Sequence, residues 1–323
     1  MTDKAKTVKM TEDELNDLHK SYEVIGKFLA RQSHAQHEAP VDPSFIRFMQ
    51  TEIEVECATA LNTRTDERIT LNVIKKFCPS ATFADITYEF LGDFENYCIR
   101  TGRSINTINK YFRHIKKFVY IGMDKDLIQK NPFRHYRIRN QASRRAHLSP
   151  EELRAFENLK LTGRDTRYQK VLDMFLFSCY TGLRFSDIKS LNIKELKTEY
   201  GQKWIEKDMQ KTGESIRVPV SCLFSGKPLA ILHEYLSPET GEIFNEMSNP
   251  HVNRCLKELA NLAGVHKLVC FHVARHTFAT LLLNKGISIT TVQKLLGHKK
   301  IQTTQIYSKV IDTTMIKELT HHN

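Results

Sequence analysis

Residues 131–148 divide the chain into two parts. They contain five arginines and no acidic residue, and they separate two stretches whose apolar residues recur at helical spacing. A chain of 323 residues is long enough for two domains. We therefore expect an N-terminal helical extension over 1–42, a helical domain over 43–130, a basic linker over 131–148 and a second domain over 149–323.

The basic linker has two interpretations. It is either a solubilising connection between domains or a strap that crosses DNA. We favour the strap, because the run contains arginine but no lysine and arginine pairs bidentately with phosphate. The linker residues expected to contact DNA are Arg137, Arg139, Arg144 and Arg145.

The first domain has the pattern of packed helices with apolar faces. Phe45 begins the first of them, and Thr87 and Ser104 are placed to cap two later helices. The helix after Ser104 has a basic side opposite its apolar residues. Such a side is commonly just solvated, but in a basic chain it is also a candidate for lying along a phosphate backbone. Its candidate DNA contacts are Arg113, Lys116 and Lys117.

The second domain opens with a clear helix start. Ser149 and Glu152 have the spacing of a capping box, with a proline at the first helical position. A mostly apolar helix then ends at Gly182, and Ser186 is placed to cap the next one.

The periodicity of the second domain then changes. Residues 203–206 and 215–220 alternate as short strands, and 210–214 form a hairpin connection that contains a glycine. Helical spacing resumes afterwards. The expected fold class is mainly α, with a small antiparallel sheet in an otherwise helical second domain.

The charge balance indicates a polyanionic partner. Lys and Arg number 48 against 37 Asp and Glu, which gives a net charge of +11 and a pI of about 9.2. Nucleic acid is the first choice, an acidic membrane surface the second, and a generally basic soluble protein the alternative. The seven cysteines stand singly, which favours free thiols in a reducing compartment. The absence of a signal core or a long apolar run predicts a cytoplasmic protein.

Residues 272–307 carry groups suited to phosphate chemistry. His272 and Arg275 lie one helical turn apart and therefore share a face. Tyr307 supplies a hydroxyl that can attack phosphorus, although its reference pKa near 10 requires help from neighbouring cations. His298 follows a helix-stopping glycine and can donate a hydrogen bond.

Two residues from earlier in the second domain complete the candidate set. Arg184 follows a helix end, where the backbone can aim its guanidinium into a cleft. Two guanidiniums can donate hydrogen bonds to the non-bridging oxygens of one phosphodiester. Lys211 on the hairpin connection could protonate a leaving oxygen. Each residue alone is more often a surface charge or a packing residue, and it is the ordered set that is informative.

The order and local context of these residues resemble the tyrosine recombinase family, of the phage-integrase type. The first domain resembles, more weakly, the SAM-like core-binding domain of that family. The resemblance implies that the second domain is a catalytic domain of the DNA breaking-rejoining type. The blocks that carry it are 181–187, 210–212, 272–280, 295–298 and 303–307.

The resemblance implies roles at the phosphate. Arg184 and Arg275 would bind the scissile phosphate, and His298 would donate a hydrogen bond to it. Asp187, in the block that follows the first arginine, would support the site by orienting its neighbours.

It also implies roles in the transfer of protons and of the phosphoryl group. Tyr307 would form a 3′-phosphotyrosyl bond, and His272 would assist proton transfer at this nucleophile. Lys211 would be the general acid for the departing 5′-hydroxyl. Because transesterification keeps the bond energy in the protein–DNA link, no metal, ATP or other cofactor is expected.

The partner implied by the resemblance is double-stranded DNA at paired sites. The chain would self-associate there as a dimer or tetramer through its C-terminal segment, 311–323. Accessory DNA-bending proteins are further candidates, and no membrane partner is expected. The implied function is site-specific recombination or integration of DNA, as in a mobile element. The alternatives are a type IB topoisomerase, which shares this chemistry, and a non-catalytic DNA-binding regulatory module of a mobile element.

Overall fold

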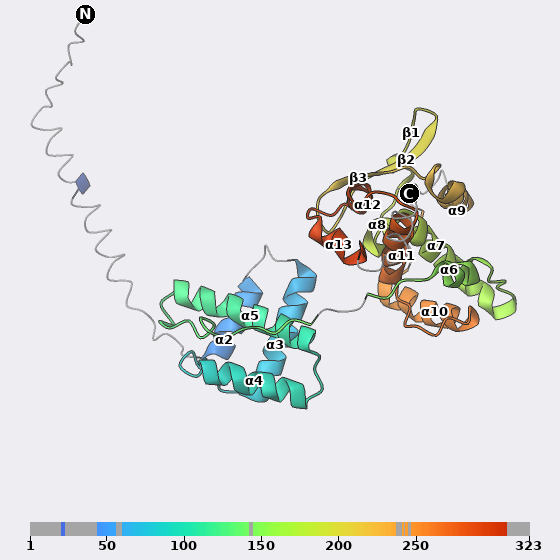
Figure 1. The fold of residues 1–323 in the computed structure, drawn as a ribbon. Helices are drawn as coiled ribbons and strands as arrows, with labels where there is room; N and C mark the ends of the chain where they lie inside the picture. Colours follow the sequence, from blue (N-terminus) through green and yellow to red (C-terminus); the bar gives the residue numbers. More distant parts are fainter. Residues whose placement is uncertain are drawn as a thin grey trace, which may run out of the picture. The chain divides into compact units, whose positions relative to one another are not determined.

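The computed structural model divides between residues 142 and 143 into two compact units, each described here by itself (Figure 1). Three expectations from the sequence fall outside the described residues: the N-terminal extension except for 21–22, Arg144, and the C-terminal segment 311–323. The structure describes residues 21–22, 44–55, 60–141, 145–236, 241, 243–244 and 247–308.

The first unit is helical throughout its described elements. Phe45, Phe94 and Phe112 lie in its core with no more than 1% of their surface exposed. The two predicted caps are confirmed, because Thr87 accepts a hydrogen bond from the amide of Phe90 and Ser104 accepts one from Thr107. Its helices are α2 (Phe45–Val55), α3 (Leu61–Phe77), α4 (Tyr88–Arg100) and α5 (Ile105–Asp124).

Part of the basic side of α5 faces α3 rather than open solvent. The Lys117 ammonium lies 2.9 Å from the carboxylate of Glu67, which is 1% exposed. The ammonium of Lys116 lies over the ring of Phe133, 5.9 Å from its centroid. Arg113, by contrast, is exposed. Lys117 therefore neutralises a buried carboxylate, a role that the sequence pattern did not indicate.

The second unit is also mainly helical. Its described residues also form three short 3-10 segments: η1 (Gly163–Tyr168) and η2 (Ile193–Glu195) before the sheet and η3 (Leu223–Gly226) after it. The predicted capping box at its start is confirmed, since Ser149 and Glu152 exchange side-chain and backbone hydrogen bonds. The helices are α6 (Pro150–Glu157), α7 (Gln169–Thr181), α8 (Phe185–Lys189), α9 (Lys227–Tyr235), α10 (Asn249–Leu262), α11 (Phe271–Asn284), α12 (Ile289–Leu296) and α13 (Gln302–Ser308).

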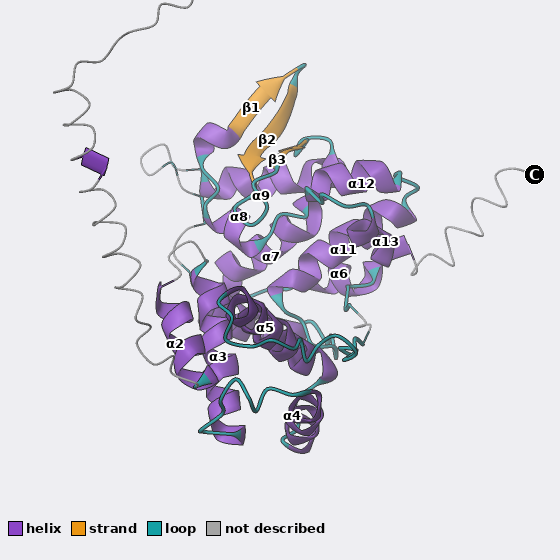
Figure 2. Cartoon of the chain, turned by 90° about the vertical axis from the view of Figure 1, so that its left-hand side faces the viewer, coloured by secondary structure: helices purple, strands orange, loops and turns teal. Residues whose placement is uncertain are grey.

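A small antiparallel sheet lies at one end of this unit (Figure 2). Its strands pair in the order β1–β2–β3, and Ile205 in the middle strand faces Leu196 on one side and Val218 on the other. The strands are β1 (Leu196–Glu199), β2 (Gln202–Asp208) and β3 (Ser215–Val218). The expected fold class, mainly α with a small antiparallel sheet, is confirmed.

Three local expectations need correction. The strand β1 was not predicted, because its four residues, Leu-Lys-Thr-Glu, show no alternation of apolar and polar side chains. The last strand ends at Val218 because Pro219 has no amide hydrogen to donate. Ser186 is not the N-cap of α8; Arg184 holds that position, and its amide donates to the carboxylate of Asp187.

Helix α11 runs through the middle of the second unit. It packs against α7, α10, α12 and α13 (Figures 1 and 2). Within α11, every residue except His272 and Asn284 is buried. The helix is therefore enclosed on nearly all sides, and its polar residues Arg275, His276 and Thr277 reach the interior of the unit. Among the described helices, none is both long and apolar enough to cross a membrane.

Gly182 joins the fold to the site. It ends α7 with a φ of +71°, and an added Cβ would lie 2.5 Å from a ring carbon of Phe278 on α11. Only glycine adopts this left-handed conformation readily, and only glycine leaves room for the phenyl ring.

We predict that Gly182→Ala lowers the free energy of unfolding of the second unit by about 2–4 kcal/mol. About 1 kcal/mol of this comes from the left-handed conformation and the rest from overpacking against Phe278. Urea denaturation measures the loss. The matched control is Gly163→Ala, where φ is +57° but nothing lies within 4 Å of the added carbon, so about 1 kcal/mol is expected. Equal losses at the two positions would contradict the close approach to Phe278.

Candidate active site

Arg275 is the largest polar side chain in the interior of the second unit, with 2% of its surface exposed. One terminal nitrogen of its guanidinium donates to the carbonyl of Gly182, at 2.7 Å, and the other donates to the carbonyl of Leu296. These two carbonyls lie at the ends of α7 and α12. The guanidinium is thus fixed by backbone groups from two other helices, and its orientation does not depend on side-chain rotamers elsewhere.

Arg184 is positioned by a buried carboxylate. Asp187, which is fully buried, accepts a hydrogen bond from the Arg184 amide at 3.3 Å, and its carboxylate lies 3.8 Å from the Arg184 guanidinium. The other oxygen of Asp187 accepts from the amide of Gln210, at 3.2 Å. Asp187 therefore ties Arg184 to the hairpin that carries Lys211.

Lys211 lies in the connection between β2 and β3 and is exposed. Its charge is near enough to His272 to help lower the pKa of that imidazole. An exposed ammonium on a flexible four-carbon stem can move to meet a group bound beside the histidines.

His298 is linked to α13. Its Nδ1 atom shares a hydrogen bond of 2.9 Å with the hydroxyl of Thr304, which is buried. This contact leaves Nε2 as the ring nitrogen for a ligand. Burial, together with the charges of Arg275 and Arg184, lowers the pKa of His298 to about 4. The imidazole is therefore neutral at pH 7.

Tyr307 is buried on α13, with 4% of its surface exposed. Its hydroxyl lies 2.8 Å from Nδ1 of His276 on α11. Burial raises the pKa of the phenol. The charge of Arg275, the charge and hydrogen bond of Arg145, and the charge of Arg184 oppose that rise. The candidate nucleophile is thus a phenol, not a phenolate, at neutral pH, and it has an imidazole as its hydrogen-bond partner.

His276 was not among the candidate site residues from the sequence. Burial, together with the neighbouring His272, Arg145 and Arg275, lowers its pKa to about 3. One signal could have found it, because it follows Arg275 directly and lies one turn after His272 in an otherwise apolar helix. A polar residue on that helix is buried and needs a partner, and the partner is Tyr307.

His272 packs against His276. The two rings meet edge to face, with centroids 4.4 Å apart and planes at 84°. His272 keeps a solvent-exposed side, yet the protein around it and the cations Arg275 and Arg145 lower its pKa to about 4. It is therefore neutral at pH 7 and borders both the buried histidine and the open side of the site.

Arg145 is the one linker arginine whose charge acts on this site, among those that the structure describes. It lowers the pKa of His272, His276, His298 and Tyr307. The other described candidates for DNA contact lie in the first unit, where Arg139 also pairs with Glu95 at 3.4 Å. They are Arg113, Lys116, Lys117, Arg137 and Arg139.

The six candidate catalytic residues come together in the second unit. The guanidinium of Arg275 bonds the carbonyls of Gly182 and Leu296, two residues before Arg184 and His298. Asp187 joins Arg184 to the connection that carries Lys211. His276 contacts both His272 and Tyr307. The set combines the cations of Arg184, Arg275, Lys211 and Arg145 with neutral imidazoles and the carboxylate of Asp187. Cations held together in a partly buried space repel one another, so an anion that binds all of them stabilises the site.

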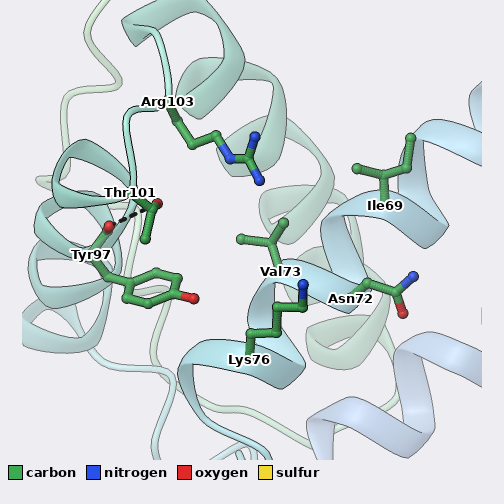
Figure 3. Close-up of a pocket in the computed structure, with 7 residues that line it drawn as sticks. All are labelled: Ile69, Asn72, Val73, Lys76, Tyr97, Thr101 and Arg103. Carbon is green, nitrogen blue, oxygen red and sulfur yellow. Dashed lines mark hydrogen bonds between the residues drawn. The ribbon is translucent and has the colours of Figure 1, made fainter.

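A separate pocket in the first unit also gathers cations. It has a volume of about 330 Å³ and lies between α3 and the end of α4. Arg103 and Lys76 extend into the same space from opposite sides, and the hydroxyl of Tyr97 is turned toward it (Figure 3). Two cations and a hydroxyl in this arrangement can hold an anionic oxygen.

Both units match family models. Residues 147–313 match the phage integrase family, and residues 44–138 match the phage integrase SAM-like domain. A tyrosine recombinase from Thermosipho africanus is 30% identical over 223 residues, which cover 65% of this chain and 71% of the relative.

Solved structures show the same fold at low sequence identity. The Tn1549 transposon integrase in complex with a circular intermediate DNA is 18% identical, with a TM-score of 0.68, over 82% of this chain and 94% of that one. A lambda integrase tetramer bound to a Holliday junction is 17% identical, with a TM-score of 0.69, over 85% of this chain and 80% of that one.

The low pKa of His276 predicts that acid destabilises the second unit. The unfolded chain binds a proton at this residue below pH 6.5, whereas the folded chain does not until about pH 3. Stability is therefore lost as the pH falls through this window. At pH 5 the loss due to His276 is about 2 kcal/mol relative to pH 7. His276→Asn should remove this part of the pH dependence in urea denaturation, whereas the exposed His233→Asn should not. Equal pH dependence in His276→Asn and the parent chain would contradict the burial of a neutral imidazole.

Proposed function

This chain belongs to the phage integrase family of tyrosine recombinases, and we propose that it breaks and rejoins DNA at specific sites through a 3′-phosphotyrosyl bond to Tyr307. One observation carries the proposal. The hydroxyl of Tyr307 is held beside an imidazole, within the field of two guanidiniums whose positions are fixed by buried groups. The candidate nucleophile and two guanidiniums that can bind an anion therefore lie together.

The reaction begins with the scissile phosphodiester bound between the two arginines. The carbonyls of Gly182 and Leu296 use only part of the N–H groups of the Arg275 guanidinium, and the remaining N–H groups bind the phosphate. Arg184 binds it from the N-terminus of α8. His298 donates from Nε2, because Nδ1 is turned to Thr304. Together these groups offset the negative charge that grows on the phosphoryl oxygens in the transition state.

The chemical step exchanges one ester for another. The Tyr307 oxygen attacks phosphorus, the new bond joins the tyrosine to the 3′ side of the strand, and the 5′ oxygen departs. Lys211 supplies the proton to that oxygen from the β2–β3 connection. The reverse reaction with a 5′-hydroxyl from another strand completes recombination. In this scheme arginine, lysine and histidine side chains neutralise the charge, and the reaction requires neither a metal nor ATP.

We assign DNA binding to both units. The unit that ends at residue 142 would be the core-binding domain, and the unit that follows it would be the catalytic domain. The linker arginines would contact the phosphate backbone of the DNA as the linker crosses it. In the first unit, exposed Arg113 and the pocket of Lys76 and Arg103 suit phosphate oxygens. Assembly on paired sites as a dimer or tetramer is proposed by analogy with the lambda integrase tetramer bound to a Holliday junction. Exchange of residues 311–323, accessory DNA-bending proteins and a cytoplasmic location belong to the same proposal.

A nicked duplex traps the covalent intermediate, because the short fragment beyond the nick diffuses away after cleavage. We expect the chain to form a denaturation-resistant adduct with a pool of such duplexes carrying random sequence around the nick. Tyr307→Phe should abolish the adduct and leave DNA binding near normal, since only a buried hydroxyl is lost. Tyr200→Phe, at a residue that is 95% exposed, is the control. Adducts that persist in Tyr307→Phe would exclude Tyr307 as the nucleophile.

Loss of Arg184 should slow cleavage far more than it weakens binding. Removal of one donor that stabilises transition-state charge costs roughly 10²–10³ in rate. We expect this loss for Arg184→Ala in single-turnover cleavage of the trapped DNA. Arg154→Ala, on the exposed side of α6, should cleave normally. A rate for Arg184→Ala within a few fold of the parent chain would exclude the two-guanidinium site.

A further inference from the structure

The proton of the Tyr307 hydroxyl has to leave when the oxygen attacks phosphorus. The phenol is buried, and burial raises its pKa, so the phenolate is not available beforehand at neutral pH. A base must therefore accept the proton during the attack. Such a base lies within hydrogen-bond distance of the hydroxyl.

We propose that His276 is the catalytic proton acceptor for Tyr307, an inference that rests on the proposed function of Tyr307 as the nucleophile. Nδ1 of His276 lies 2.8 Å from the hydroxyl oxygen, and both residues are buried. The two rings have centroids 5.4 Å apart. The contact joins α11 to α13, which pack against each other, so it is part of the fold of the second unit.

We assign the proton of this hydrogen bond to the phenol. Nδ1 of His276 then accepts it, and the ring proton lies on Nε2. The ring is neutral, because burial and the neighbouring His272, Arg145, Arg275 and His147 all disfavour its cationic form. His276 is therefore able to accept a proton at any pH near neutrality.

The same surroundings make His276 a weak base until DNA arrives. A bound phosphodiester brings one negative charge, and the pentavalent transition state carries a second. A unit negative charge about 5 Å away raises proton affinity roughly a hundredfold at the effective dielectric of a protein site. The proton affinity of the Tyr307 oxygen falls as its bond to phosphorus forms, while the phosphate stabilises the imidazolium. Transfer to His276 therefore becomes favourable during the attack, when the scissile phosphate lies between Arg184 and Arg275. The free enzyme keeps its nucleophile protonated and inactive.

The bond from the Tyr307 oxygen to phosphorus forms, and the bond from phosphorus to the 5′ oxygen breaks. The phenolic proton moves to Nδ1 of His276, and the 5′ oxygen takes a proton from Lys211. In rejoining, the attacking 5′-hydroxyl gives its proton to the neutral Lys211 amine, and His276 returns its proton to the departing Tyr307 oxygen.

His272 acts as a positioning residue in this arrangement. Its ring packs edge to face on that of His276, and it limits the directions in which His276 can turn. This contact gives His272 a part in proton transfer at the nucleophile without a direct bond to the hydroxyl.

His276→Asn tests the proposal, because the Asn oxygen occupies a position like that of Nδ1 and can still accept the hydrogen bond, but it cannot take the proton. The probe is the nicked duplex that the parent chain cleaves. We expect single-turnover cleavage to slow by roughly 10²–10⁴, the range for loss of general-base catalysis, with DNA binding retained. The control is His233→Asn, an exposed histidine on α9. Cleavage by His276→Asn at or above the parent rate would overturn the proposal and leave His276 a holding contact.

A sulfur substitution separates the two proton transfers. In a duplex whose bridging 5′ oxygen at the scissile phosphate is replaced by sulfur, the leaving thiolate needs no proton. Lys211→Ala should be slow on ordinary DNA and restored on the sulfur-bridged DNA. His276→Asn should stay slow on both, because its defect lies at the nucleophile. Restoration of His276→Asn by sulfur would place its role at the leaving group and overturn the proposal.

A DNA-free measurement tests the contact independently of the proposed function. In protein labelled with ¹⁵N-histidine, the Nδ1 resonance of His276 should shift between the parent chain and Tyr307→Phe, because the hydrogen bond is lost. An unchanged resonance would overturn the proposal. If the parent chain forms no DNA adduct but this resonance shifts, the proposed function fails while the pairing of His276 and Tyr307 stands.

Discussion

The guanidinium of Arg275 is the group on which the rest of the second unit depends. A buried cation is costly unless its donors are satisfied, and breaking a buried charge pair typically costs about 3–5 kcal/mol. Here the compensation comes from the carbonyls of Gly182 and Leu296, where α7 and α12 end. The left-handed residues that end these helices, Gly182 and Gly297, have no room for a side chain against Phe278 and Ile216, respectively. The same glycines therefore end the helices, allow the close packing and place the carbonyls that orient the Arg275 guanidinium.

The electrostatics of the site follow from burial and from the number of cations gathered there. Arg184 and Arg275 repel each other. The pKa values of the imidazoles of His272, His276 and His298 are lowered first by the loss of solvent around them and then by the neighbouring cations, so these rings stay neutral. A phosphodiester changes each of these conditions at once. It relieves the repulsion, it accepts hydrogen bonds from neutral donors, and it raises the basicity of the ring beside the nucleophile. Substrate binding and activation of the nucleophile are thus coupled by charge.

Sequence patterns predicted what depends on neighbours along the chain. The caps at Thr87, Ser104 and Ser149 and the end of α7 at Gly182 are local, because a side chain meets a backbone group within a few residues. The family motifs selected six residues that the fold does bring together.

Interactions across the fold were not predictable in this way. Lys117 lies in a basic helix side, yet it pairs with Glu67, 50 positions away in the chain. His276 was passed over although it contacts Tyr307, because their meeting depends on how α11 packs against α13. The strand β1 forms only because β2 offers it a partner.

The central claim is that Arg184 and Arg275 share one phosphate beside Tyr307. A crystal structure of the Tyr307→Phe chain bound to its uncleaved DNA site tests it most directly. We predict a single phosphodiester whose non-bridging oxygens accept hydrogen bonds from both guanidiniums, with the substituted phenyl ring on α13 next to the phosphorus. A complex in which the two arginines contact different phosphates, or none, would contradict the account.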